Sequence, residues 1–290
     1  MMEKKWDLSE KRKFTAEDLR EIMRKLLGPD GCPWDRAQTH TSIRKNLIEE
    51  AYETVDAIDT GASERIKDEL GDVLLQVYFH AEMAEKAGEF SFEDITDNIS
   101  RKLISRHTHI FGNDRADTPD AVLSVWDKNK MLEKNQSTFA QTLLDLPAGL
   151  PSLMKSDKIQ KRAAKAGFDW PDAKGAREKI DEELSEIEFE LIRDKKISYA
   201  GVDPGKEPDR FSRLESEIGD LFFAAVNFSR LLGVDSEVAL NRANDRFIRR
   251  FSVMEDQAKQ DGMTLNSLNP EKMDRLWEEV KQREKKDENR

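Results

Sequence analysis

Two sets of acidic residues occur in this 290-residue chain, and both follow the same order. Each has a Glu-Glu-x-x-Glu stretch and, further along, a Glu-x-x-Asp stretch. The first set consists of Glu49, Glu50, Glu53, Glu69 and Asp72, and the second of Glu182, Glu183, Glu186, Glu217 and Asp220. Residues three apart project from one edge of a helix, so two antiparallel helices would bring four of these carboxylates together. Four converging anions predict a site for a hard divalent cation such as Mg²⁺, Mn²⁺ or Ca²⁺.

Apolar residues at helical spacing predict the elements that would hold the first set. One stripe consists of Ile43, Leu47, Ala51, Val55 and Ile58, and the next of Ile66, Leu70, Val73, Val77, Ala81 and Ala84. Residues 59–63 (Asp-Thr-Gly-Ala-Ser) are typical of a turn, and Ser63 is the expected N-cap of the second helix. So short a connection predicts an antiparallel helical hairpin, which is the arrangement that the acidic pairs require.

The second half of the chain repeats this order. Its two stripes consist of Ile180, Leu184, Ile187 and Leu191, and of Ile218, Leu221, Phe222, Ala225 and Leu232. Phe222 and Phe223 are expected in the core, and residues 198–208 in an exposed loop. Further helices are predicted over residues 91–105, 119–133, 238–258 and 270–281. The charged residues 281–290 are expected to form a solvated, fraying end.

Composition limits the class of protein. Charged residues make up 37% of the chain and the formal net charge is -11, which argues against general binding to nucleic acid. The single cysteine, Cys32, excludes an internal disulfide and suits a reducing cytoplasm. The N-terminus lacks the apolar segment of a signal peptide, and the longest apolar run, residues 221–226, is too short to span a bilayer. A soluble, helical, cytoplasmic protein is predicted, with neither nucleic acid nor a membrane as its partner.

Basic and aromatic residues repeat along with the acids. Lys102 and Arg106 follow the first set, and Arg246 and Arg250 follow the second at the same offset. Basic groups four apart share a helix face, where they suit a chain of phosphates. A tryptophan then follows in each half, at positions 126 and 277, and is suited to stacking on a base. The ordered duplicate of acids, bases and aromatics favours a polyphosphate ligand carrying a base.

On these residues the sequence resembles the MazG family of nucleoside triphosphate pyrophosphohydrolases. The family pattern is a Glu-Glu-x-x-Glu followed at variable distance by Glu-x-x-Asp, and the likeness covers nearly the whole chain. Further matching stretches lie at residues 31–35 (Gly-Cys-Pro-Trp-Asp), 106–111, 158–162 and 167–170. The duplicated motif is similar to the long, two-domain bacterial form of the family.

The resemblance implies two tandem all-α, MazG-like helical-bundle domains at residues 11–135 and 151–284, joined by a linker at 136–150, in a homodimer. It implies Mg²⁺-dependent hydrolysis of nucleoside triphosphates to monophosphates and pyrophosphate, with Mn²⁺ as a possible substitute. The physiological role would be nucleotide-pool cleaning or a stress response. The implied metal ligands are Glu50, Glu53, Glu69 and Asp72 in the first domain and Glu183, Glu186, Glu217 and Asp220 in the second. The implied nucleotide-binding residues are Lys179, Arg213, Arg246, Arg250 and Trp277, with Lys102 and Arg106 in the first domain.

Two roles rest on position alone. Glu49 and Glu182, the first residues of each Glu-Glu pair, are not needed as ligands and could orient or deprotonate a water molecule. The second domain is expected to be the main site because it has more cationic groups close together in sequence. Trp34 and Trp170 could serve either as packing residues or as base contacts.

Four other functions compete with this interpretation. A Ca²⁺-sensing protein would use a loop with alternating ligands and a central glycine, whereas the acids here are expected on helices. A di-iron carboxylate bundle would need Glu-x-x-His pairs, and none of the four histidines has a carboxylate three residues before it. A non-enzymatic helical adaptor that kept the acidic motif stays open, and would show no pyrophosphate release. A pyrophosphatase restricted to dUTP or dCTP also stays open, and a substrate panel would distinguish it.

Overall fold

The computed structural model describes residues 13–193, 196–199 and 201–288. Its internal contacts divide the chain into two units, Met1–Glu133 and Lys134–Arg290, called the first and second unit below. The regular structure of the described residues is almost entirely helical, which confirms the predicted all-α class. The only strands in this described part, which the sequence analysis did not predict, are β1 (Ile192–Arg193) and β2 (Lys196–Ile197), an antiparallel ribbon.

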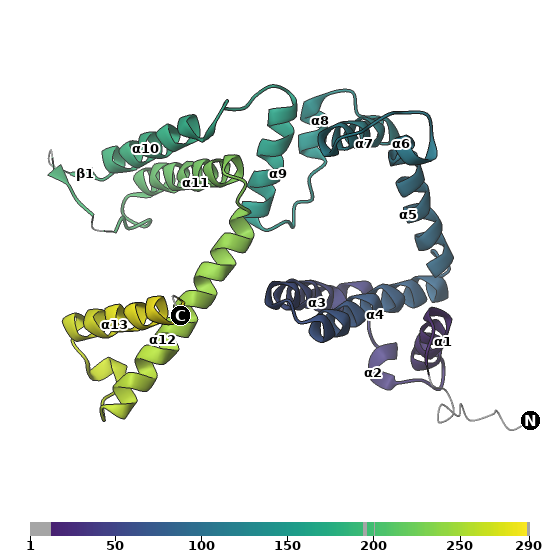
Figure 1. Ribbon diagram of the computed structural model, residues 1–290, viewed down its shortest axis with the longest axis horizontal. Coiled ribbons are helices and arrows are strands. Elements are labelled where there is room, and N and C mark those ends of the chain that lie inside the picture. The colour runs from purple at the N-terminus through teal and green to yellow at the C-terminus, as the bar shows by residue number, and fades with distance from the viewer. Residues whose placement is uncertain (1–12, 194–195, 200, 289–290) are drawn as a thin grey trace, which may run out of the picture. The chain divides into compact units, whose positions relative to one another are not determined.

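The first unit is built around a helical hairpin. Its helices are α1 (Ala16–Leu27), α2 (Pro33–Arg36), α3 (His40–Thr60), α4 (Ser63–Ala87), α5 (Phe92–Arg106), α6 (Thr108–Phe111) and α7 (Pro119–Glu133). The long helices α3 and α4 run side by side and antiparallel, as predicted (Figure 1). Gly61 ends α3 in the left-handed conformation, at φ 69°, which lets the chain reverse within two residues.

The core of the first unit forms where α1 packs on this hairpin. Its buried centre consists of Met23, Leu27, Ile43, Tyr78 and Phe79. Polar contacts fix α1 to the same surface: the Tyr78 hydroxyl donates to the carbonyl of Ala16, and Nη2 of Arg20 lies 3.3 Å from Oε2 of Glu85 on α4. The hairpin is therefore held by α1 at one face, while the carboxylates lie between its own two helices.

The second unit contains another long antiparallel pair. Its elements are α8 (Phe139–Leu144), α9 (Ser152–Lys165), α10 (Ala173–Glu190), the ribbon, α11 (Pro208–Leu231), α12 (Ser236–Gln260), η1 (Leu265–Ser267) and α13 (Pro270–Glu288). Helices α10 and α11 lie side by side, α9 packs against α11, and α13 packs against α12 (Figure 1). The α10–α11 pair thus holds the second acidic set as the α3–α4 pair holds the first.

The predicted core position of Phe222 and Phe223 is wrong. Phe222 is 60% exposed and Phe223 is 39% exposed. Ile218, one turn before Phe222 on the same face of α11, is exposed as well. The apolar residues of α11 lie on one face of the helix, as predicted. No described segment of the same chain covers this face.

Three smaller differences concern boundaries. The N-cap of α4 is Ala62, not Ser63, which is the first residue of the helix. Residues 281–288, expected as a fraying end, continue α13 as far as Glu288. The contact division falls between Glu133 and Lys134, and the predicted linker, residues 136–150, contains the short helix α8. The predicted domain bounds themselves stay a prediction.

Candidate functional site

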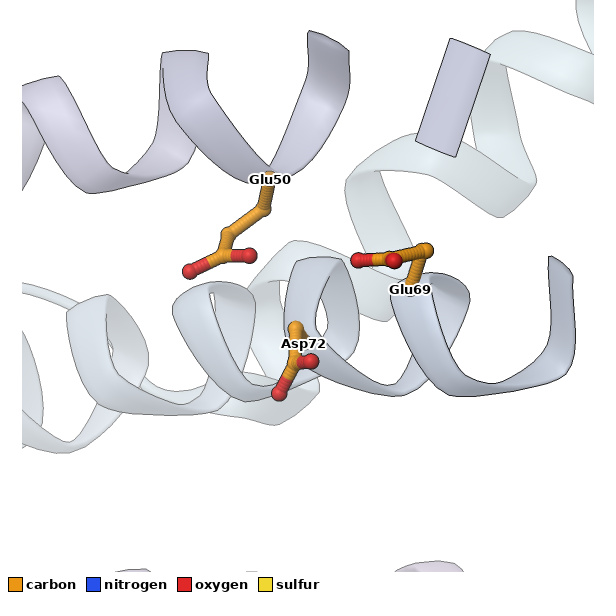
Figure 2. A group of neighbouring side chains, drawn as sticks. All are labelled: Glu50, Glu69 and Asp72. Carbon is orange, nitrogen blue, oxygen red and sulfur yellow. The ribbon is translucent and has the colours of Figure 1, made fainter. Parts of the chain in front are cut away.

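The first acidic set converges across the α3–α4 hairpin. Glu50 projects from α3 toward Glu69 and Asp72 on α4, as Figure 2 shows. Each of the three offers one carboxylate oxygen, and these oxygens all lie within 4.8 Å of one another. Three hard oxygen donors at this spacing are suited to Mg²⁺ or another hard divalent cation.

Electrostatics in the first cluster reflect the crowding of like charges. Burial raises the pKa of Glu50, and the nearby carboxylates of Asp72 and Glu53 raise it further. Glu53 lies one turn along α3 and is exposed, outside the group of three. Glu49 is also exposed. A cation among these groups would remove the repulsion that disfavours ionised Glu50.

The second acidic set converges in the same way. Glu183 and Glu186 on α10 and Glu217 on α11 each offer an oxygen within 4.8 Å of the others. Glu183 is 2% exposed, and its Oε2 has no hydrogen-bond partner among the described residues. Burial and the neighbouring carboxylate of Glu183 raise the pKa of Glu186. Asp220 is exposed and lies outside this group.

A lysine is part of the second cluster. The ammonium Nζ of Lys179 lies 2.6 Å from Oε1 of Glu183 and 2.9 Å from Oε1 of Glu182. Hydrogen bonds to these two carboxylates raise the pKa of Lys179. Lys179 stands one helical turn before Glu183, and the residue one turn before Glu50 is Asn46. Two of the three acids in each cluster occupy equivalent positions, Glu50 with Glu183 and Glu69 with Glu217, but the counter-charge differs.

In each unit an arginine stands one turn before the first acid of the Glu-x-x-Asp stretch, Arg65 before Glu69 and Arg213 before Glu217. Arg65 lies 2.5 Å from Asp56 and 3.6 Å from Glu69. In the second unit, Nε of Arg213 lies 3.0 Å from both carboxylate oxygens of Glu190. The sequence analysis named Arg213 but missed Arg65. The repeated Arg-x-x-x-Glu spacing was the signal that could have found it.

Comparison with known proteins identifies the family. The model of the MazG nucleotide pyrophosphohydrolase domain matches residues 38–111, which contain the whole first cluster. The nucleoside triphosphate pyrophosphohydrolase/pyrophosphatase MazG of Thermotoga maritima is 42% identical over 265 residues, covering 91% of this chain and 95% of that protein. The chain belongs to the MazG family.

Two further MazG relatives show different extents of likeness. The nucleoside triphosphate pyrophosphohydrolase of Escherichia coli strain K12 is 40% identical over 264 residues, covering 91% of this chain and 95% of that protein. The nucleoside triphosphate pyrophosphohydrolase of Mycobacterium tuberculosis is 39% identical over 138 residues, 47% of this chain and 41% of that protein. The resemblance found in the sequence motifs is thereby confirmed at family level.

The predicted phosphate-binding residues of this MazG chain hold partners of their own. In the first unit, Arg106 donates to both carboxylate oxygens of Glu133, at 2.8 and 2.9 Å, and lies over the ring of Trp126. Lys102 is half-buried one turn earlier on α5. Among the described residues, no hydrogen bond or ion pair joins these two cations to the acids of the first cluster, so their role stays a prediction.

The same holds for the cations of α12. Nε of Arg250 lies 2.7 Å from Glu284 on α13, and Arg246 is exposed. Trp277 packs against Phe247, with ring centroids 5.1 Å apart. In the part of the chain that the structure describes, none of these groups bonds to the second cluster. Among all the described residues, no helix is both long and apolar enough to cross a bilayer.

Proposed function

We propose that this chain hydrolyses nucleoside triphosphates to nucleoside monophosphates and pyrophosphate at its two acidic clusters, with Mg²⁺ as cofactor. The observation that supports this most directly is the pair of three-carboxylate groups, each with its oxygens within 4.8 Å. Relatives that align with 91% of this chain bear the name of that activity. An acidic site needs a divalent cation before it can accept a polyanionic triphosphate.

The residues present fit a magnesium ion. The donors are carboxylate oxygens, and the buried Oε2 of Glu183 lacks any partner among the described residues, as expected of a ligand atom. Bound there, Mg²⁺ would supply charge neutralisation and orientation of the phosphates, and Mn²⁺ would fit the same donors. Glu53 would be the fourth ligand of the first cluster and Asp220 the fourth ligand of the second. Each lies one helical turn from a residue already in its cluster.

The remaining polar residues are assigned by their place around the clusters. Glu182 and Glu49 are exposed neighbours of ligands, and each would orient and deprotonate the attacking water. Lys179 already contacts Glu183, so it would turn from this carboxylate to a phosphate oxygen when the cation binds. Arg213, Arg246, Arg250, Trp277, Lys102 and Arg106 would hold the nucleotide.

We propose that the protein is a homodimer that covers the apolar faces of the two hairpins. In the first unit, Val55 and Ile58 on α3 and Leu70 on α4 are 45–56% exposed. In the second, Leu184 and Phe222 are 45% and 60% exposed. Apolar residues at helical spacing that no segment of their own chain covers are typical of an association surface. Its free cysteine, Cys32, is compatible with a cytoplasmic location.

The test is a panel of canonical and damaged triphosphates, assayed with Mg²⁺, with Mn²⁺ and with chelator. We expect pyrophosphate and a nucleoside monophosphate in equimolar amounts, and no turnover with chelator. Release of orthophosphate, or turnover that chelator leaves unchanged, would contradict the proposal. Sedimentation of the same preparation measures the oligomeric state. A monomer at micromolar concentration would contradict the proposed homodimer.

A further inference from the structure

A cavity opens in the first unit beside the first acidic cluster. Its volume is about 240 Å³, and Glu50 lies in its wall. Pockets for drug-sized ligands usually measure roughly 300–1,000 Å³. The cavity is therefore large enough for one ring system but not for a whole nucleotide. Because Glu50 belongs to both the cavity and the cluster, a group in the cavity could be joined to phosphates at the cluster.

The cavity contains a buried polar group without a partner. Gln76 on α4 lines it and is 6% exposed, and its Oε1 has no hydrogen-bond partner among the described residues. The buried neighbours around it, Met23, Ile43 and Phe79, are apolar. A buried carbonyl oxygen left without a donor destabilises the fold. A ligand that donates a hydrogen bond there would remove this penalty.

The other polar groups of the cavity are also mostly acceptors. They are the carboxylates of Asp35 and Glu50 and the carboxamide of Asn46. Asn46 occupies the position that corresponds to Lys179 in the second unit, so an uncharged side chain stands here in place of an ammonium group. A lining rich in acceptors favours a ligand edge that donates, such as the exocyclic amino group of a nucleobase.

An aromatic ring stands at the cavity with more than half of its surface free. Trp34, which begins the cavity-lining stretch of α2, is 59% exposed. The loop before it is fixed on α1: the amide of Cys32 donates to the carbonyl of Leu26, at 2.8 Å. At Gly31 a Cβ would lie 2.1 Å from the same carbonyl, so only glycine fits there. The sequence left open whether Trp34 packs or stacks, and its exposure beside a cavity favours stacking.

We propose that this cavity is the nucleobase subsite of the first acidic cluster, and that it prefers bases with an exocyclic amino group. Trp34 stacks on the base, Gln76 accepts from the amino group, and the triphosphate extends past Glu50 to the cation. The inference rests on the proposed function, and it assigns a substrate class to the first unit. We do not assign Trp170 the same stacking role in the second unit, because Gly175 lies directly beneath the Trp170 ring.

The test measures binding to the full-length chain carrying Glu183→Gln, which impairs the second cluster. The ligands are hydrolysis-resistant α,β-methylene analogues of dATP, dCTP, dUTP and dTTP, and inorganic tripolyphosphate, all with Mg²⁺. We expect the two amino-bearing analogues to bind more tightly than the other two. Gln76→Met should weaken their binding about tenfold, as should Trp34→Ala, and Trp34→Phe should restore most of it. Tripolyphosphate should bind all variants within twofold.

Gln160→Met is the matched control. Gln160 is a glutamine of the second unit that is 5% exposed, and its Nε2 donates to the carbonyl of Phe223. It should leave the base preference unchanged. If Gln76→Met fails to fold, the exposed Trp34 still provides the test. Equal binding of all four analogues, or equal losses for tripolyphosphate, would overturn the subsite. Loss of the proposed function would instead appear as no pyrophosphate release by the parent chain.

Discussion

The two hairpins carry the same acidic pattern in sequence but compensate its negative charge differently. In the second unit, Lys179 contacts Glu183 directly, so the cluster contains its own cation. In the first unit, Asn46 takes that position, and Arg65 approaches only the outer acid, Glu69, at 3.6 Å. The first cluster is thus left with more uncompensated negative charge around Glu50.

Under the proposed function, this difference suits the two copies of the motif to different tasks. A lysine at the cluster can move to a phosphate when a cation binds, which favours a triphosphate over the cation alone. An asparagine at the same place leaves room for the cavity, and the first cluster would bind the cation without competition from an ammonium group. The second unit is then suited to turnover, and the first to selection of a base.

The largest effect should come from removing one ligand from each cluster in turn. We expect Glu183→Gln to lower pyrophosphate release about a hundredfold or more, since even groups behind a ligand contribute 10- to 100-fold. Glu50→Gln should lower it less than tenfold, because we expect the second unit to be the main site. Steady-state assays of both variants decide this. Glu178→Gln, an exposed acid on the same helix, is the control.

Equal losses in the two ligand variants would make the units equivalent and end the proposed division of tasks. A larger loss for Glu50→Gln would reverse it. Circular dichroism must show the helical content of the parent in each variant, because Glu183 is buried.

A second prediction exchanges the counter-charges. Lys179→Asn should tighten binding of Mg²⁺ alone, because the cation no longer competes with an ammonium, and should weaken triphosphate binding about tenfold. Asn46→Lys should weaken Mg²⁺ binding at the first cluster by a similar factor. Calorimetric titration with Mg²⁺, then with a nucleotide analogue, measures both. If Lys179→Asn shifts the two affinities in the same direction, the lysine has no part in the exchange.

Most of the cluster geometry could be predicted because it depends on local spacing. Glu183 and Glu186 lie one turn apart on any helix, and a short connection forces α3 and α4 to be antiparallel. Rotation of one helix against its neighbour is not local. It decides that Glu53 and Asp220 lie outside the groups of three oxygens, which no residue spacing could show.

The exposure of Phe222 could not be predicted for a different reason. A periodic stripe shows which face of a helix is apolar, but not whether the group that covers it belongs to the same chain. The pairing of Lys179 with Glu183 could have been found, since oppositely charged residues four apart commonly interact on helices. The cavity beside Gln76 depends on how α1, α3 and α4 pack, and no pattern of residues indicated it.

A third prediction concerns pH, with Mg²⁺ as the variable. Burial and like charges raise the pKa of Glu50 above its ordinary value of 4.5, and that of Glu186 likewise. Between the ordinary and the raised pKa the folded chain binds more protons than the unfolded chain, so without metal its stability falls as pH rises. Mg²⁺ binds the ionised form. Its stabilising effect should therefore be small at pH 4.5 and reach about 2–3 kcal/mol at pH 8 at a hundredfold excess over Kd.

Melting curves with and without Mg²⁺ at several pH values test this. Other titrating groups, such as His80, contribute equally to both curves and cancel in the difference. The double variant Glu50→Gln with Glu183→Gln should lose the metal-dependent shift. A shift of equal size at every pH would contradict the assignment of these carboxylates as ligands.

The smallest effect concerns two glycines inside helices, Gly71 on α4 and Gly219 on α11. A Cβ at either position would meet nothing within 4 Å in the single chain. Helix propensity alone makes Gly→Ala stabilising by about 0.5–1 kcal/mol. Gly219, however, lies next to Ile218 and one turn before Phe222, on the exposed apolar face of α11. In the proposed homodimer a partner helix would approach there, and an added methyl would destabilise that contact by about 1–3 kcal/mol.

We therefore expect Gly219→Ala to lower the melting temperature by a few degrees and to weaken dimerisation, with sedimentation velocity at several concentrations as the measurement. Gly71→Ala tests the equivalent face of the first unit. If only one variant is destabilised, that unit forms the interface and the other hairpin is covered by something else or by nothing. If both variants are more stable and associate as the parent does, no helix packs closely on either glycine. The exposed apolar stripes would then need another explanation than dimerisation.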